Sequence, residues 1–387
     1  MNLERNIFDW LVNLNSFSTN EIVTSQSRIF FYKMIINLDE MLPSEIIDTI
    51  NVLNNELEKK ENSKGVIGLE VRNIKGNMCC PKCSSNNIKK NGKYMGRQLY
   101  KCKDCNKKFN VLTNTPFHHT RLRYKQIEEA YKCLINKLSI RKMANIIGIS
   151  IKTAFILRFK IISCLSNVAN NKKLKGTSQL DEYYLPINLK GTKTQNMPRS
   201  SKKRQKNGTG TSGISKHTVC VVSGVDDNDN MFFKVGGTSS VSSNMIRNII
   251  TPFIENGSKV ITDCKSSYES IAIENNWNLK QIKSACHVDN EGNSLATINS
   301  LHSELDLFLS GFRGVSTKHL PQYLDWFVYI KHLNYTKEYN EQASEFKKDT
   351  ITLNTPIKCS NVFNNYSNIE FSEIYADYYY QPSKCIT

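Results

Sequence analysis

Two Cys-x-x-Cys pairs constrain the fold of this chain more than any other feature of its sequence. Cys80 and Cys83 form the first pair, and Cys102 and Cys105 form the second. A tetrahedral zinc ion binds four thiolates, and one tight turn can supply two of them, so two turns close a site. The spacing therefore predicts a zinc ribbon over residues 77–112, with a structural Zn²⁺ at these four cysteines. A redox-active pair or unconnected thiols is the alternative interpretation.

The zinc ribbon is rich in basic residues, and so is the whole chain. Lysine and arginine outnumber aspartate and glutamate by 52 to 35, which gives a formal net charge of +17. An excess of this size favours a polyanionic partner, with nucleic acid as the first candidate. The alternative is that lysine and asparagine are abundant because the genome is rich in AT. The basic residues of the ribbon, which suit contacts with phosphates, are Lys89, Lys90, Lys93, Arg97, Lys101, Lys107 and Lys108.

Residues 113–172 have the pattern of a helix-turn-helix domain. Apolar residues recur at helical spacing over 140–147, Gly148 interrupts the pattern, and Ser150 can cap a second helix over 151–162. In a helix-turn-helix domain the second helix enters the major groove of DNA. A plain helical hairpin would have a similar pattern, and it is the alternative. The residues of the second helix that we predict to bind DNA are Lys152 and Arg158.

Beyond residue 175 the apolar runs have the length of strands and alternate with helical stretches. Such interleaving indicates an α/β domain, which we place at residues 175–340. A polar stretch rich in lysine, arginine, glycine and serine, residues 190–216, is predicted to form a basic loop within it. The chain is therefore expected to be multidomain, with a helical N-terminal extension (1–76) and a C-terminal tail (341–387). The predicted strands cover residues 179–185, 218–225, 231–235 and 259–262.

Two aspartates stand on separate predicted strands. Asp181 lies within the first strand, and Asp263 directly follows the fourth. Carboxylates on two strands could hold a pair of Mg²⁺ or Mn²⁺ ions, which would activate water or a DNA 3′-hydroxyl. Because side chains alternate along a strand, only one of Asp181 and Glu182 is expected to enter such a site. For a single strand-end aspartate, a role in a turn or cap is the alternative.

The order of several short motifs resembles that of a known family. From the cysteine pairs to about His332, the chain is similar to the ISXO-two-like insertion-sequence transposases, the fifteen-ninety-five family related to Merlin elements. The matching motifs cover about two thirds of the chain and are specific in combination. They are Gln179-Leu180-Asp181-Glu182-Tyr183, Met197-Pro198-Arg199, Gly213-Ile214-Ser215-Lys216, Val219-Cys220-Val221, Thr262-Asp263, Ile298-Asn299-Ser300-Leu301-His302-Ser303 and Phe312 to Leu320 with Tyr323-Leu324.

The resemblance implies a ribonuclease-H-like catalytic core of the DDE type. Asp181 and Asp263 match its first two catalytic metal ligands, and Asn299 matches the third position, which is Glu or Asn in the family. Asn299 is a neutral ligand and would hold a metal more weakly than a carboxylate. Members with Asn usually carry a lysine where this chain has Asp306, which is a further candidate ligand. The candidate DNA-binding residues in this part of the chain are Arg199, Lys202, Lys203, Arg204, His302, Arg313 and Lys318. For a single histidine such as His302, a structural role is the alternative.

These features together predict a DNA transposase. It would bind the terminal inverted repeats of a transposon and catalyse metal-dependent strand cleavage and transfer on double-stranded DNA. Because two ends must be held together, a homo-oligomer is expected. The alternative is a domesticated, catalytically inactive protein that retains DNA binding. Neither a signal peptide nor a membrane span is indicated, so an intracellular location with the genomic DNA is expected.

Overall fold

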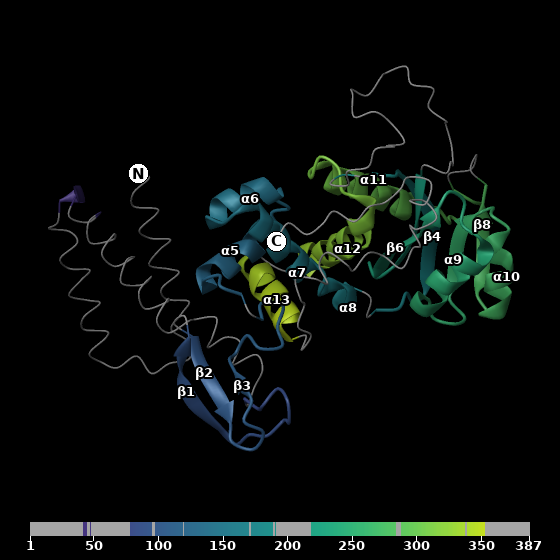
Figure 1. Ribbon diagram of the computed structural model, residues 1–387. Helices are drawn as coiled ribbons and strands as arrows, with labels where there is room; N and C mark the ends of the chain where they lie inside the picture. The colour runs from purple at the N-terminus through teal and green to yellow at the C-terminus, as the bar shows by residue number, and fades with distance from the viewer. Residues whose placement is uncertain are drawn as a thin grey trace, which may run out of the picture. The chain divides into compact units, whose positions relative to one another are not determined.

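The computed structural model divides the chain into two units, Met1–Gly65 and Val66–Thr387. The structure describes residues 42–44, 47, 78–94, 97–118, 120–169, 172–188, 190, 218–283, 288–336 and 339–352. Figure 1 draws these residues as ribbons in colour. Almost all of the predicted N-terminal extension and of the basic loop lies outside the described residues. The predicted DNA contacts that fall outside them are Arg199, Lys202, Lys203 and Arg204.

A three-stranded antiparallel sheet lies between the two cysteine pairs and beyond them. Its strands, in the order β1-β2-β3, are β1 (Ile88–Tyr94), β2 (Arg97–Cys102) and β3 (Lys108–Phe109). Its small buried core consists of Cys80, Tyr100, Cys102 and Phe109. A core of this size rarely stabilises a domain without a metal or another staple. The structure therefore agrees with a ribbon that depends on its cysteines.

Four helices follow the ribbon: α5 (Tyr124–Ile135), α6 (Ile140–Ile147), α7 (Ile151–Ile162) and α8 (Leu165–Ala169). The hydroxyl of Ser139 caps α6, and the hydroxyl of Ser150 accepts a 3.1 Å hydrogen bond from the backbone N–H of Thr153 at the start of α7. Gly148 ends α6 in the left-handed conformation, with φ of 69°. The helix, the glycine turn and the second helix thus occupy the residues that the sequence predicts.

A five-stranded mixed sheet forms the next part of the chain, in the order β6-β5-β4-β7-β8. The first three of these strands pair antiparallel, whereas β7 and β8 run parallel to β4. This mixed α/β core is consistent with the expected ribonuclease-H-like fold. The strands are β4 (Thr177–Pro186), β5 (Thr218–Asp226), β6 (Met231–Thr238), β7 (Lys259–Asp263) and β8 (Asn278–Ile282).

Helices cover the sheet through two separate apolar clusters, because alternate strand residues point to opposite faces. On β5, Cys220 and Val222 join one cluster with α9 (Ser243–Ile250) and α10 (Ser267–Glu274). On the same strand, Val219 and Val221 join the other cluster. The helices of this second cluster are α11 (Ala296–Ser310) and α12 (Leu320–Thr336), and short 3-10 turns cover Thr251–Phe253 and Thr317–His319.

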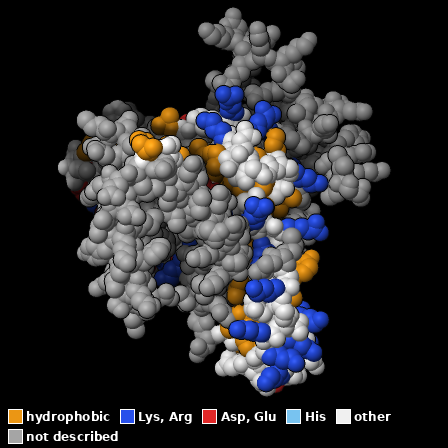
Figure 2. All heavy atoms as spheres, turned by 90° about the vertical axis from the view of Figure 1, so that its left-hand side faces the viewer, with side chains coloured by type: hydrophobic (Ala, Val, Ile, Leu, Met, Phe, Trp, Pro, Cys, Tyr) orange, Lys and Arg blue, Asp and Glu red, His pale blue; other side chains and the backbone are white. Residues whose placement is uncertain are grey.

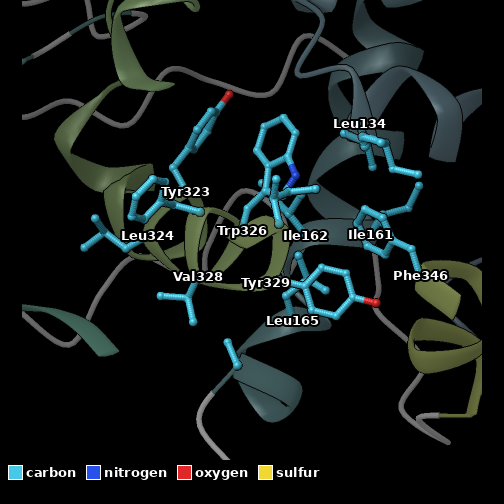
Figure 3. Packing of buried hydrophobic residues seen from close by; sticks show 14 of the residues in the cluster. Leu134, Ile161, Ile162, Leu165, Tyr323, Leu324, Trp326, Val328, Tyr329 and Phe346 are labelled. Atoms are coloured by element: carbon cyan, nitrogen blue, oxygen red, sulfur yellow. The ribbon is translucent and has the colours of Figure 1, made fainter. Parts of the chain in front are cut away.

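The second cluster also contains the helices that precede the sheet. Figure 3 shows Leu134 of α5, Ile161 and Ile162 of α7 and Leu165 of α8 around α12 side chains such as Trp326. The last described helix, α13 (Tyr339–Thr352), packs on α5. There the hydroxyls of Tyr131 and Thr350 lie 2.6 Å apart, and the rings of Tyr131 and Phe346 meet edge to face. One continuous core therefore joins the predicted helix-turn-helix to the sheet, and the predicted tail begins inside a packed helix.

No described helix is both long enough and apolar enough to cross a membrane.

Candidate metal sites and nucleic-acid-binding residues

The structure brings the two predicted cysteine pairs together. The sulfur atoms of Cys80, Cys83, Cys102 and Cys105 all lie within 4.8 Å of one another, with 3.4 Å between Cys80 and Cys105 and 3.6 Å between Cys83 and Cys102. Four converging sulfurs are the ligand set of a structural zinc site. Cys79 is exposed and does not belong to the cluster. The arrangement fits Zn²⁺ with all four ligand positions filled by protein.

Local hydrogen bonds prepare this cluster for a metal. Burial raises the pKa of the Cys80 thiol, but hydrogen bonds from the backbone N–H groups of Lys82 and Cys83 outweigh this effect and lower it to about 6. The neighbouring sulfurs raise the pKa of Cys83, so of this first pair Cys80 more readily forms the thiolate that a metal needs. Beside the four cysteines, the carboxylate of Asp104 accepts a hydrogen bond from the Ser85 hydroxyl and a second one, at 3.0 Å, from the side-chain amide of Asn87. Asp104 belongs to the second cysteine turn and its partners follow the first, so the pairing holds the two turns together.

A second cluster of candidate ligands forms where β4 and β7 separate. The last pair of residues that joins these strands is Gln179 and Ile261. Beyond it, carboxylate oxygens of Asp181, Glu182 and Asp263 lie within 4.8 Å of one another. The expectation that only one of Asp181 and Glu182 would enter the site was wrong. Because β7 no longer pairs beside them, side chains from both faces of β4 can reach around its open edge.

Glu182 is held by two partners on the α10 side of the sheet. Its side chain is only 5% exposed, and its carboxylate lies 2.9 Å from the ammonium of Lys265. The hydroxyl of Tyr268 donates a second hydrogen bond to it at 2.8 Å. Glu182 is therefore an ion-paired carboxylate whose position is fixed before any metal binds.

Asp181 and Asp263 have the properties of metal ligands. Burial, together with the negative charge of Asp263, raises the pKa of Asp181 to about 6, although the backbone N–H of Glu182 donates to it at 2.8 Å. The Oδ1 atom of Asp263 is buried and has no hydrogen-bond partner within the described parts of the chain. A buried carboxylate oxygen without a partner is unfavourable unless a cation satisfies it. The donor set thus fits a divalent cation that prefers oxygen ligands.

Helix α11 lies along one face of β4 and contacts every second residue of the strand. The amide of Gln179 contacts the first turn of α11, accepting from the N–H of Ile298 at 3.0 Å. Asp181 faces His302, with 3.9 Å between Oδ2 and Nδ1. The Tyr183 hydroxyl donates to the carboxylate of Asp306. The period of two along the strand thus matches a rise of about one helical turn along α11.

This arrangement places the other two predicted ligands differently. Asn299 is exposed on α11, one turn before His302 and on the same helix face, so it lies on the side of the helix that faces Asp181. Asp306 does not belong to the carboxylate cluster, because the hydroxyl of Tyr183 holds it one turn beyond His302. The suggestion that Asp306 supplies a further metal ligand is therefore not supported by the structure.

The structure favours the structural alternative for His302 over a contact with phosphate. Its ring is 6% exposed, stacks on Tyr183 with 4.6 Å between ring centroids, and has its Nε2 atom 2.7 Å from the Ser223 hydroxyl. Burial lowers the pKa of His302 to about 4, so the ring is neutral near pH 7. A buried neutral ring cannot bind phosphate by charge. His302 instead packs behind Asp181.

The predicted DNA-binding residues of α7 have opposite environments. Lys152, in the first turn, is exposed. Arg158 is 1% exposed, donates to the backbone oxygen of Leu138 and to the Tyr323 hydroxyl, and lies over the ring of Trp326 at 5.4 Å. The prediction that Arg158 contacts DNA was wrong, because the second half of α7 is buried against α12. Of the remaining predicted contacts that the structure describes, Arg313 is exposed and Lys318 is partly buried.

Comparison with known proteins agrees with this geometry. The family described as ISXO2-like transposase domain matches residues 173–331, which contain all three carboxylates, Asn299 and His302. The chain is also 27% identical over 250 residues to an uncharacterized protein in transposable element ISH50 of Halobacterium salinarum (strain ATCC 700922 / JCM 11081 / NRC-1), across 63% of this chain and 82% of that protein. The sheet and its converging carboxylates lie within the segment that the family model matches. Residues 173–331 of this chain therefore match an ISXO2-like transposase domain of the DDE type.

Proposed function

We propose that the chain is a DNA transposase that binds transposon terminal inverted repeats and carries out metal-dependent strand cleavage and transfer. The observation that carries the proposal is the convergence of Asp181 and Asp263 at the open edge of β4, inside a transposase domain. When bound, Mg²⁺ or Mn²⁺ ions would activate water or a 3′-hydroxyl and stabilise the leaving oxygen in each phosphoryl transfer.

The chain's own residues divide the remaining work. Asp181 and Asp263 would hold the cations, and the carbonyl oxygen of Asn299 would approach from α11 as a neutral ligand. Glu182 adds negative charge behind them, and Lys265 balances it. His302, as a neutral ring, packs beside Asp181 and contacts the Ser223 hydroxyl, which donates to the backbone oxygen of Asp181. The negative charge that attracts the cations would therefore come from the carboxylates of β4 and β7, because Asn299 would be a neutral ligand.

We further propose that zinc fills the cysteine cluster and that the basic N-terminal parts bind the DNA. A four-cysteine site has no open position, so its zinc would stabilise the ribbon and take no part in the chemistry. The exposed first turn of α7, with Lys152, is the part of the helix-turn-helix that remains free to enter a major groove. Since transposition requires two ends, we expect a homo-oligomer to act on DNA.

A strand-transfer assay tests the catalytic proposal. Terminal-repeat DNA, Mn²⁺ and a target plasmid are incubated with the native chain and with Asp181→Asn and Asp263→Asn. The matched control is Asp227→Asn, since Asp227 is an exposed carboxylate of the same domain that lies outside the cluster. We expect product from the native chain and the control, and a loss of roughly 100-fold or more in both site variants, because each loses a charged metal ligand.

Two other outcomes would decide against the proposal. Equal product from the native chain and Asp181→Asn would refute the assignment of Asp181. If the native chain binds the repeats tightly and yields no product with Mn²⁺, the result favours the domesticated DNA-binding form.

A further inference from the structure

The outer face of the ribbon sheet carries a row of three lysines, one from each strand. In the strand register Lys89 of β1 is paired with Lys101 of β2, and Lys101 is paired with Lys108 of β3. The neighbouring pair of Tyr100 and Phe109 points to the opposite face, where both rings are buried in the cysteine core. The three lysines therefore share the face that points away from the core. We call Lys89, Lys101 and Lys108 the lysine row.

The lysine row is unfavourable for the isolated ribbon. Neighbouring strands lie about 4.8 Å apart, and like charges directly opposite each other on a sheet are destabilising. Within the described residues no carboxylate pairs with any member of the row. Asp104 is the one acidic residue between positions 78 and 109, and it is already bonded to Ser85 and Asn87. An anion that binds across the row would relieve this repulsion, so the row favours a polyanionic partner.

We propose that the lysine row binds the phosphate backbone of duplex DNA. Figure 2 shows lysine and arginine side chains gathered over the lower part of the molecule, where the ribbon lies. Three ammonium groups on flexible stems, spaced across a rigid sheet, can follow successive phosphates of one strand. This inference rests on the proposed action on DNA, and it adds that the ribbon binds backbone without sequence preference.

The chemistry of the row explains why it should not select bases. Sequence is read mainly by groups that make paired hydrogen bonds to base edges, such as the arginine fork. Lysine is a point charge and suits phosphate. The arginine of this sheet, Arg97, is not free for such a contact, because its guanidinium donates to the backbone oxygens of Thr120 and Leu122. The ribbon would therefore contribute affinity and orientation, and α7 would contribute base contacts.

Salt-dependent binding of the full-length protein tests the proposal. The affinity for a labelled random-sequence duplex is measured across a salt series for the native chain and for Lys89→Gln/Lys101→Gln/Lys108→Gln. Each phosphate contact contributes about 0.9 to the slope of log K against log salt. We expect the triple variant to lose about 2 to 3 units of slope. The native chain should therefore bind more tightly than the triple variant at 50 mM salt, and the ratio of their affinities should fall by about 40-fold at 200 mM salt.

A control variant with the same change in net charge separates the effect of the lysine row from the effect of net charge. Lys82→Gln/Lys90→Gln/Lys103→Gln removes three exposed lysines of the same ribbon that lie outside the row. We expect it to lose less than about 1 unit of slope. Zinc content and melting temperature, measured for both triple variants, show whether the ribbon still folds.

Three outcomes would overturn the proposal. Equal losses of slope in the two triple variants would mean that only net charge matters. An unchanged slope in the row variant would exclude DNA as the partner, and a selective loss of binding to polyglutamate with unchanged DNA binding would identify an acidic protein segment instead. Because the probe is random-sequence duplex without divalent metal, a failure of the transposase proposal in the strand-transfer assay leaves this measurement unaffected.

Discussion

The ring of His302 lies between Asp181 and Ser223, with 3.9 Å from its Nδ1 atom to the aspartate Oδ2 and 2.7 Å from its Nε2 atom to the serine hydroxyl. The same hydroxyl donates to the backbone oxygen of Asp181 at 2.9 Å. The strand residue that is proposed to hold a cation is thus supported by its cross-strand neighbour, Ser223, and by a helix. Support of this kind fixes the position of a ligand before the metal arrives.

Replacing this histidine should therefore affect both folding and metal binding. His302→Leu leaves the Ser223 hydroxyl without one buried partner, so we expect the free energy of unfolding to fall by about 1–3 kcal/mol. We also expect Mn²⁺ affinity to fall by about 10-fold or more, as for other residues that orient a ligand. Urea unfolding and Mn²⁺ titration measure the two effects. Ser303→Ala, at the next and exposed position, should change stability by less than about 0.5 kcal/mol; an equal effect would contradict the prediction.

Two buried histidines should make the fold sensitive to acid. Burial lowers the pKa of His302 to about 4 and that of His319 to about 3, against an ordinary value of 6.5. Between the folded and unfolded values only the unfolded chain takes up these protons, so stability is lost as the pH falls below about 6.5. Each histidine contributes up to about 1.4 kcal/mol per pH unit. The raised pKa of Asp181 has the opposite effect on stability. Between pH 3.8 and about 6 the folded chain binds this proton and the unfolded chain does not, so Asp181 stabilises the fold as the pH falls.

A single variant isolates this effect. His319 packs against the rings of Phe155 and Phe159, so His319→Phe keeps an aromatic ring in place. Urea unfolding at pH 7, 6 and 5 should show a smaller loss of stability for His319→Phe than for the native chain. If the free energy of unfolding of the two proteins depends on pH in the same way, His319 does not take up a proton when the chain unfolds, and the prediction is wrong.

Metal binding should weaken as the pH falls through the pKa of Asp181. Burial raises this pKa to about 6, and a proton on the carboxylate excludes a cation. Below that pH we expect the Mn²⁺ affinity to fall by up to about 10-fold per pH unit for one competing proton. Calorimetric titrations between pH 5 and 7.5, without DNA, measure it. Asp181→Asn should bind weakly at every pH and lose this dependence; an unchanged profile would place the competing proton elsewhere.

Zinc removal should affect the ribbon selectively. Cys102→Ser removes one of four converging sulfurs, and we expect loss of the zinc, since structural zinc contributes directly to the folding of small domains. The ribbon should then become sensitive to protease while the sheet domain stays folded. Cys79→Ser is the matched control, because Cys79 is exposed and outside the cluster. Metal content by mass spectrometry and limited proteolysis test this, and zinc loss in the Cys79 variant would contradict the assigned ligand set.

Two basic residues of α7 should respond in opposite ways. Arg158 is buried against Tyr323 and Trp326, so Arg158→Ala should lower the free energy of unfolding by about 2–4 kcal/mol through lost packing and unpaired polar groups. Lys152 is exposed, and Lys152→Ala should leave stability within about 0.5 kcal/mol while weakening DNA binding. Chemical denaturation and fluorescence anisotropy compare the pair. A stable Arg158→Ala variant with weaker DNA binding would restore the role first predicted for this arginine.

The sequence predicts the parts of the fold that short-range chemistry determines. Cysteines two residues apart can meet a metal only in a tight turn, so the ribbon cluster followed from spacing alone. Gly148 and Ser150 determine the end of one helix and the start of the next through local backbone preferences. Strands β5, β6 and β7 were predicted from their runs of apolar residues, which are typical of buried strands.

Long-range packing explains what the sequence did not predict. Helical periodicity cannot show that α12, more than 150 residues later, would bury Arg158. Strand alternation excluded Glu182 from the site, because the rule assumes neighbours on both sides and β7 leaves one side open. Strand β8 (Asn278–Ile282) has few apolar residues and lies at the edge of the sheet, so its pattern was too polar to predict. The signal that could have included Glu182 in the carboxylate cluster is its position directly after Asp181 in the sequence.

One hydrophobic core is shared by α5, α7, α8, α12 and the sheet, so the helix-turn-helix is packed against the domain that carries the carboxylate cluster. If α7 reads bases and the carboxylates act on a phosphate of the same duplex, as proposed, the two contacts would be a constant number of base pairs apart. Inserting about 5 bp between them would turn the cleavage point to the far side of the duplex. The packing of the protein, together with its base contacts, would then determine which spacings within a terminal repeat are cleaved.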